Sequence, residues 1–119
     1  MEIQIIQVKD KNIAEIIADK VIISETQDAL DLMADAGWQG ASGLMLNAEN
    51  FTPDFFDLKT GIAGDILQKF STYNMRLAII GDFSAVKSKS LNDFIFESNK
   101  YGRISFVSSR EEAIKKLSR

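Results

Sequence analysis

Four acidic residues in the middle of the chain are the first candidates for chemistry: Glu49, Asp54, Asp57 and Asp65. Asp54 and Asp57 are three residues apart, so on a helix they share one face, where two carboxylates could hold a hard cation or act as an acid and base pair. No second cluster at a metal-binding or catalytic spacing accompanies them. Carboxylates near the start of a helix also stabilise it through the helix dipole, by about 0.3–1 kcal/mol each. We therefore interpret these residues as helix-start residues and expect neither a metal site nor a cofactor.

The composition excludes several large enzyme classes. The chain has 119 residues with no His and no Cys, so it cannot form a Ser-His-Asp or Cys-His nucleophile, a thiolate or imidazole metal site, or a redox-active cysteine pair. An enzyme would have to use carboxylates, with Asp57, Asp82 or Glu97 as acid or base. Asn47 or Asn99 would orient its substrate. No nucleophile lies beside a recognisable base, so we expect a non-enzymatic binding or regulatory module and keep the carboxylate enzyme as the alternative.

Polar residues collect directly after the expected strands, where parallel α/β sheets commonly bind ligands. Asn47 and Asp82 each follow an apolar run. The same residue types serve as helix caps and turn residues in proteins generally, and we favour that role for them. Aromatic residues alternate with them, and aromatic side chains ringed by polar groups are typical of interaction hot spots. With burial of the Phe rings in the core as the alternative, the binding residues expected at this edge are Asn47, Phe51, Asp57, Thr60, Asp82 and Phe83.

Apolar runs predict the strands. The first run is followed by a polar turn and by the apolar clusters of residues 13–23, which most simply form a second strand that pairs with the first. A short helix over 13–18 is the competing interpretation. The run from Leu77 to Ile80 is uncharged, which predicts a strand buried on both faces. Further strands are expected at about 43–47, 76–80 and 103–107.

Capping residues mark the helix starts between these strands. Thr52-Pro53-Asp54 predicts the start of a helix that continues to about Tyr73, and Gly61 and Gly64 favour a break within it. The expected caps along the chain are Ser24, Thr52, either Ser88 or Ser90, and Ser109. The alternation predicts one α/β domain over residues 1–119, with a mostly parallel sheet, an N-terminal antiparallel strand pair and about four helices.

The charge pattern limits the classes of partner that the protein is expected to bind. The chain carries 14 Lys and Arg against 17 Asp and Glu, a net charge of −3 with both signs interspersed, and this argues against binding to nucleic acid. No apolar run is long enough to cross a membrane, so we expect a cytoplasmic protein whose partner is an unidentified protein or small ligand. Gly61 and Gly64 are small residues three apart on a helix, which leaves a homodimer open. We favour close packing of this helix on its own sheet.

Several segments form a longer specific pattern: Leu46-Asn47, 55–70, 77–83, 90–95 and Glu97-Ser98-Asn99. In these residues the chain is similar to a family of small bacterial proteins known only as a domain of unknown function, number 4180. The similarity begins near Ser24 and covers nearly the whole chain. It implies no activity, because none is assigned to that family.

The succession of strand, loop and glycine-bearing helix also resembles the STAS domains of anti-sigma-factor antagonists, which implies a STAS-like fold. In those domains a phosphorylatable Ser lies in an Asp-Ser-Ser-Gly-Leu type turn at a helix start. The corresponding stretch here, residues 57–62, keeps the Asp and the Gly but has one extra residue and replaces the hydroxyl positions by Leu and Lys. Thr60 is the only hydroxyl that remains, so the resemblance leaves it as the one candidate phosphorylation site.

Overall fold

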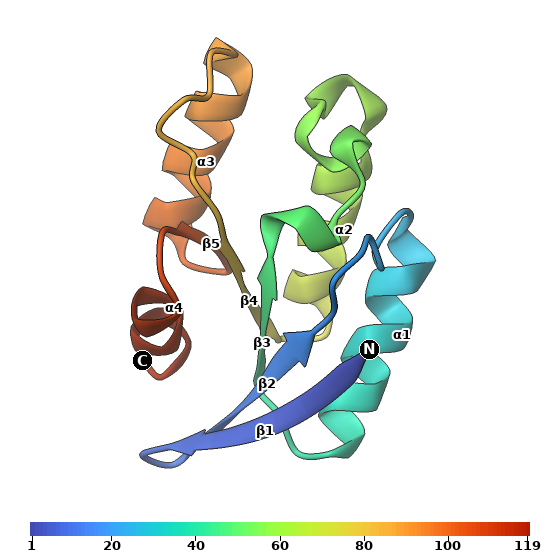
Figure 1. The fold of residues 1–119 in the computed structure, drawn as a ribbon, viewed down its shortest axis with the longest axis vertical. Helices are drawn as coiled ribbons and strands as arrows, with labels where there is room; N and C mark the ends of the chain where they lie inside the picture. The colour runs from blue at the N-terminus through green and yellow to red at the C-terminus, as the bar shows by residue number, and fades with distance from the viewer.

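The computed structural model describes all 119 residues, and it contains five strands and four α-helices (Figure 1). In chain order these are β1 (Glu2–Val8), β2 (Lys11–Ile17), α1 (Thr26–Trp38), β3 (Gly43–Asn47), α2 (Ile62–Thr72), β4 (Arg76–Ile80), α3 (Lys89–Tyr101), β5 (Ile104–Val107) and α4 (Arg110–Leu117). The α/β class is confirmed, and so is the second strand, which is favoured over a short helix. None of the helices has the length and apolar character needed to span a membrane.

The five strands form one sheet in the order β1-β2-β3-β4-β5, so each strand pairs with its neighbour in the sequence. β1 and β2 are antiparallel, as expected for the N-terminal pair, and the other pairs are parallel. Leu77 in the interior strand β4 pairs with Leu44 of β3 on one side and with Ile104 of β5 on the other. Crossovers between parallel strands are right-handed, and a strand order that always advances in one direction therefore places the connecting helices α1, α2 and α3 on the same face.

The hydrophobic core lies on both faces of the sheet. Alternate residues of a strand point to opposite faces, so Leu77 and Ile79 enter a core of 20 buried residues under α1, α2 and α3. Ala78 enters a smaller core of six buried residues, which α4 covers through Ala113 and Leu117. The sequence prediction that β4 is buried on both faces is confirmed.

The segment between β3 and α2 differs from the expected helix. It contains three short 3-10 segments, η1 (Ala48–Asn50), η2 (Pro53–Phe56) and η3 (Leu58–Thr60), and α2 begins only at Ile62. The break falls at Gly61, whose φ of 80° lies in the left-handed region that favours glycine. The broken alternative is therefore confirmed.

Two expected caps are wrong. The Thr52 side chain makes no capping hydrogen bond, because only the four-residue η2 follows it, and the Thr52 backbone N–H donates to the Ile23 carbonyl. The N-cap of α1 is Glu25 rather than Ser24, and the Asp28 carboxylate accepts hydrogen bonds from the backbone N–H groups of both residues. The other two caps are confirmed, and the Ser88 and Ser109 hydroxyls accept from Leu91 and Glu112 N–H groups.

Candidate functional site

The polar residues expected to form a site lie at the carboxyl edge, by which we mean residues 47–61, 81–88 and 108–109, which follow β3, β4 and β5. In open α/β sheets a crevice opens at this edge where the strand order reverses and neighbouring helices leave toward opposite faces. The strand order here never reverses, and α1, α2 and α3 all cover the same core. The fold therefore supplies no switch point to hold a ligand at this edge.

Asn47 and Asn50 are used to build the carboxyl edge. The two residues form a reciprocal capping box around η1, in which Asn50 Oδ1 accepts from the Asn47 backbone N–H at 3.0 Å. Asn50 is fully buried, and its amide group donates to the carbonyls of Ala18 and Lys20, each at 3.0 Å. The side-chain amide of Asn50 thus ties the segment after β2 to the end of β3, and both of its ends are engaged within the protein.

Asp82 is also engaged within its own turn. Its carboxylate accepts from the Ser84 hydroxyl at 2.6 Å and from the Ser84 backbone N–H at 3.1 Å. These two hydrogen bonds favour the charged form and hold the pKa of Asp82 below its usual value of 3.8. Asp82 is fully exposed and does not lie beside Asp57 in a common pocket.

The Phe residues form a continuous row of ring contacts that begins at the carboxyl edge. Phe51 and Phe55 are 2% and 1% exposed, respectively, so Phe51 is part of the core and the expectation of an exposed anchor at this position is wrong. Phe56 and Phe83 are half-buried, with ring centroids 6.3 Å apart. In order of contact, the row consists of Phe51, Phe55, Phe56, Phe83, Phe106 and Phe94.

Asp57 and Thr60 shape the approach to α2. The Thr60 hydroxyl lies 2.8 Å from the Asp54 carbonyl and 2.9 Å from the Asp57 carbonyl, to which it donates, and it accepts from the Ile62 N–H. Asp57 caps η3 through the Lys59 N–H. A phosphate on Thr60 would have to break the hydrogen bonds that its hydroxyl donates. A shallow pocket of about 380 Å³ places Asp57 beside Ser88 and Ser90 at the start of α3.

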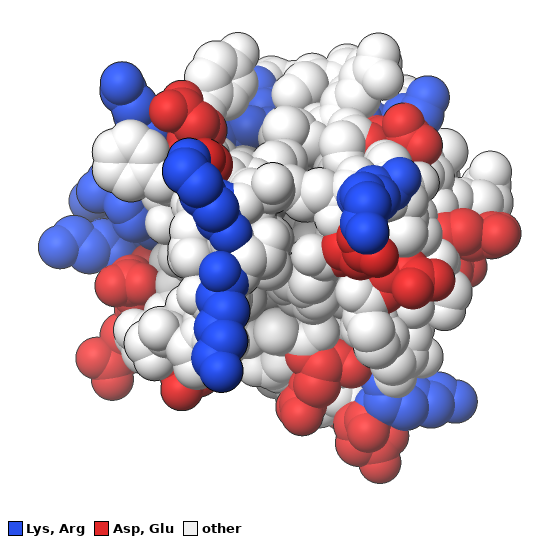
Figure 2. All heavy atoms as spheres, turned by 90° about the horizontal axis from the view of Figure 1, so that it is seen from above, with Lys and Arg blue, Asp and Glu red and all other residues white.

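The surface charges do not form a patch of one sign at this end of the molecule. Figure 2 views the molecule from above Figure 1 and shows Lys, Arg, Asp and Glu side chains interspersed around a centre without charges. Two ion pairs occur, Lys89 with Asp93 at 2.8 Å and Arg110 with Glu15 at 2.7 Å. Lys89, Asp93 and Arg110 are exposed, whereas Glu15 is half-buried. Each pair raises the pKa of its cation through the hydrogen bond to the carboxylate.

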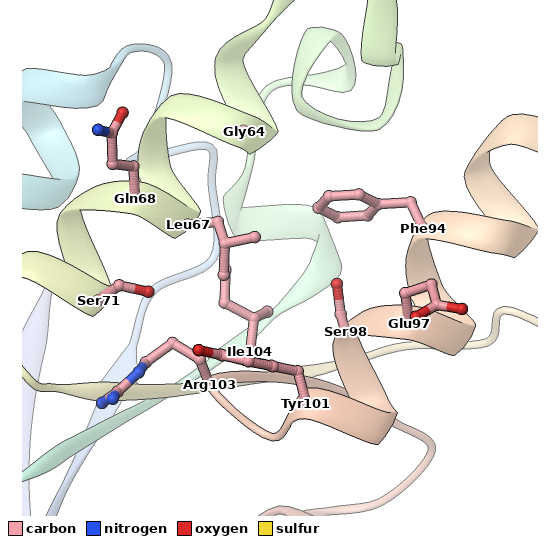
Figure 3. Close-up of a pocket in the computed structure, with 10 residues that line it drawn as sticks. All are labelled: Gly64, Leu67, Gln68, Ser71, Phe94, Glu97, Ser98, Tyr101, Arg103 and Ile104. Carbon is pink, nitrogen blue, oxygen red and sulfur yellow. The ribbon is translucent and has the colours of Figure 1, made fainter.

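A second region, which the sequence did not single out, forms a groove between α2 and α3 (Figure 3). The groove has a volume of about 480 Å³. Leu67 from α2 and Phe94 from α3 face each other across it, and Ile104 of β5 lies at its base. The remaining lining residues of the α2–α3 groove are Gly64, Gln68, Ser71, Glu97, Ser98, Tyr101 and Arg103.

Two polar groups at the base of this groove lack partners. Ser98 is only 6% exposed, its hydroxyl takes part in no hydrogen bond of the protein, and Figure 3 shows it directed into the space between Leu67 and Phe94. The Arg103 Nε is buried without a partner, while Arg103 Nη1 donates to the Met75 carbonyl at 3.4 Å. Buried polar groups are nearly always paired, so the groove differs from an ordinary surface depression.

Gly64 explains why the groove is open at its upper end. A Cβ placed on Gly64 would have no neighbouring heavy atom within 4 Å. The expected close packing of this glycine against the sheet is therefore wrong, because Gly64 faces open space. Any larger side chain at this position would project into the groove.

One comparison with known proteins identifies the family. A family model described as "Domain of unknown function (DUF4180)" matches residues 8–117. The chain belongs to this family. No curated protein and no solved structure matches it. The match covers every residue of the carboxyl edge and of the α2–α3 groove, so both regions lie within the family's domain.

One feature of the sequence could have indicated the groove. Ser98 shares a helix face with Leu91, Phe94 and Ile95, and a hydroxyl on an otherwise apolar face is the feature that could have marked the site. The lining residues on α2 and α3 occupy ordinary positions of amphipathic helices, and Arg103 and Ile104 lie at the start of β5. Their meeting depends on the spacing of α2 and α3 across the sheet, which no local pattern encodes.

Proposed function

We propose that the protein is a cytoplasmic, non-enzymatic binding module and that the α2–α3 groove is its ligand site. The observation that carries this proposal is the Arg103 Nε, which is buried in the lining of the groove and has no hydrogen-bond partner. The Ser98 hydroxyl, which is directed into the groove, also makes no hydrogen bond within the protein. An unpaired buried polar group costs about 1–3 kcal/mol, and more when it is charged, and a bound molecule that supplies the missing partner removes that cost.

The walls of the groove favour a ligand over a single water molecule. A buried water needs two to four polar partners, whereas the apolar side chains of Leu67, Phe94 and Ile104 form part of the lining of the groove. A volume of about 480 Å³ also falls within the range of roughly 300–1,000 Å³ that is typical of small-molecule sites. Both properties support a small organic molecule as the occupant.

The positions of the ionisable groups whose pKa values are shifted support binding rather than catalysis. Catalytic groups tend to have pKa values that their sites shift. The groups with shifted pKa values are Asp82, Lys89 and Arg110, which are exposed and lie outside the α2–α3 groove. A screen for hydrolase and transferase activity tests the alternative, and activity that disappears in Asp57→Asn or Asp82→Asn would overturn the proposal.

Isolation of the protein from its native host, followed by mass spectrometry of the denatured sample, tests the proposal directly. We expect a small molecule to accompany the wild-type protein and to be lost from Gly64→Leu, whose side chain fills the groove. Gly37→Leu is the matched control, because Gly37 is an exposed glycine near the end of α1 where a Cβ meets only Met75 at 3.6 Å. A molecule retained equally by both variants would place the site elsewhere.

A further inference from the structure

We infer that the ligand of the α2–α3 groove is a small amphiphilic acid, with an apolar body between Leu67 and Phe94 and a carboxylate that pairs with Arg103. This inference rests on the proposed function and adds the chemical class of the ligand. Three properties carry it: two arginines without acidic partners, a basic pocket that continues the groove, and the apolar walls of the groove.

Arg76 and Arg103 are neighbours at the end of the sheet where the parallel strands begin. Arg76 is the first residue of β4, Arg103 directly precedes β5, and the Leu77 N–H donates to the Arg103 carbonyl at 3.0 Å. Both arginine side chains are half-buried. The ion pairs of the protein involve Lys89 and Arg110, so neither Arg76 nor Arg103 has a carboxylate partner. Charged side chains that leave water are usually paired with an opposite charge, and these two lack one.

The two guanidinium groups are only partly used by the protein itself. Arg103 Nη1 donates to the Met75 carbonyl at 3.4 Å, and Arg76 Nη1 donates to the carbonyls of Lys116 and Arg119 at 3.3 Å and 3.5 Å. Arg103 Nε is buried without a partner, whereas the Nη2 groups of both arginines make no hydrogen bond and are accessible. A carboxylate has two coplanar oxygens that match the planar fork of a guanidinium. The unused N–H groups therefore suit a carboxylate.

A small basic pocket continues the α2–α3 groove toward these arginines. The pocket has a volume of about 200 Å³ and is lined by Arg76, Tyr101, Gly102 and Arg103, with no acidic residue. Tyr101 and Arg103 also line the groove, so the two spaces meet at these residues. The acidic residue of the groove lining, Glu97, is exposed on α3, whereas the Arg103 side chain runs beneath α2 (Figure 3). This end of the groove is therefore positive, although the chain as a whole carries a net charge of −3.

The walls of the groove set the rest of the ligand. Leu67 of α2 and Phe94 of α3 project toward each other, and Ile104 lies at the base (Figure 3). An apolar body between these side chains removes apolar surface from water, which is favourable. A ligand that reached only the arginines would leave these walls exposed, and one that reached only the walls would leave the positive charges unpaired. An amphiphilic acid engages both parts of the site.

Four probes with similar aliphatic chains and different head groups test the class: octanoate, 1-octanol, octylammonium and octyl phosphate. Titration of the full ¹⁵N-labelled chain, followed by NMR, gives the affinity of each probe and the amides that it shifts. We expect octanoate to bind most tightly and to shift the amides of Leu67, Phe94, Arg103 and Ile104. Added NaCl should weaken the binding of octanoate and leave that of 1-octanol unchanged, because salt screens an accessible ion pair.

Substitutions test the position of the carboxylate. Arg103→Gln should weaken octanoate about tenfold or more and leave 1-octanol within about twofold. Arg76→Gln should weaken octanoate by a smaller factor, because Arg76 lines the basic pocket but not the groove. Lys115→Gln removes an exposed positive charge on α4 and is the matched control, which should bind octanoate like the wild type. An equal loss in Arg103→Gln and Lys115→Gln would overturn the role of Arg103.

The outcomes separate this inference from the proposed function. Tighter binding of 1-octanol, octylammonium or octyl phosphate than of octanoate, or no shift of groove amides by any probe, would overturn the amphiphilic carboxylate. The probe series uses the wild-type chain, so it decides the class even if Arg103→Gln fails to fold. A co-purified neutral molecule that is lost from Gly64→Leu would overturn this inference and still support the binding function.

Discussion

The carboxyl edge and the α2–α3 groove contain similar residues, namely Asn or Gln, Ser, Gly and Phe, and use them in opposite ways. At the carboxyl edge, Asn50 makes three hydrogen bonds while fully buried. In the groove, the Ser98 hydroxyl makes none, and the buried Arg103 Nε has no partner. The comparison teaches that the presence of polar side chains does not mark a binding site. What marks it is the hydrogen-bonding capacity that the fold leaves unused.

The largest expected loss of stability follows substitution of Asn50. Asn50→Ala leaves the Asn47 N–H and the carbonyls of Ala18 and Lys20 without partners, and each unpaired group costs about 1–3 kcal/mol. We expect the free energy of unfolding to fall by about 3 kcal/mol or more, measured by urea denaturation. Asn12→Ala, which loses one hydrogen bond to Gly40 at 3.4 Å, is the control. Equal losses in the two variants would contradict the structural role of the carboxyl edge.

Substitutions at two glycines, Gly81 at the carboxyl edge and Gly64 in the α2–α3 groove, should change the stability in opposite directions. A Cβ on Gly81, at the carboxyl edge, would lie 2.9 Å from the Ala48 Cβ and 3.0 Å from the Phe83 Cζ, and overpacking of this kind costs about 1–3 kcal/mol. Gly64→Ala adds a methyl group in open space inside a helix and should stabilise by about 0.5–1 kcal/mol. Thermal unfolding of the two variants measures both effects. A loss of stability in Gly64→Ala would mean that the groove is closed in solution.

Ser109 at the carboxyl edge and Ser98 in the α2–α3 groove allow the same stability comparison for hydroxyl groups. Ser109 caps α4 by accepting from the Glu112 N–H at 3.1 Å, so Ser109→Ala should cost about 1 kcal/mol. Ser98→Ala removes an unpaired hydroxyl and adds a better helix former, so ligand-free protein should gain about 0.5 kcal/mol or stay unchanged. The samples should be unfolded and refolded first to remove bound molecules. A cost at Ser98 as large as that at Ser109 would show that the Ser98 hydroxyl is already paired within the protein.

The smallest expected effect is a pH dependence of stability that comes from Asp82 at the carboxyl edge. Hydrogen bonds from Ser84 lower the pKa of Asp82 from 3.8 in the folded state. A lowered folded-state pKa gives stability that is present above the unfolded pKa and is lost as the pH falls through the folded one. The difference in melting temperature between wild type and Asp82→Asn should therefore be present at neutral pH and disappear in acid. A difference that is the same at both pH values would contradict the role of the charge.

The sequence predicted the elements whose signals are local. The strands 43–47 and 76–80 were predicted with their observed bounds, because continuous apolar runs between polar residues describe strands buried on both faces. Ser109 was predicted as a cap because its partner lies three residues further on. Such features depend on neighbours in the chain, so one sequence is sufficient to find them.

The features that the sequence missed depend on distant residues. Thr52 was expected to cap a helix, but the chain beside it pairs with the distant segment at Ile23, and only the four-residue η2 follows. The α2–α3 groove was missed because its residues come from two helices and a strand. The polar residues of the carboxyl edge were visible in the sequence, whereas the absence of a switch point became visible only with the strand order.

The sequential strand order also has a consequence for how the protein folds. Every strand pairs with the strand immediately before it in the chain, so sheet growth begins with the β1–β2 hairpin, and each later step closes only one strand-helix-strand loop. Closing a short loop costs less chain entropy than joining distant segments, and folds rich in local contacts form faster. No strand has to insert between two that are already paired. The sheet can therefore grow from β1 toward β5 in the order in which a ribosome releases the strands, with α4 covering the second face only after β5 has joined.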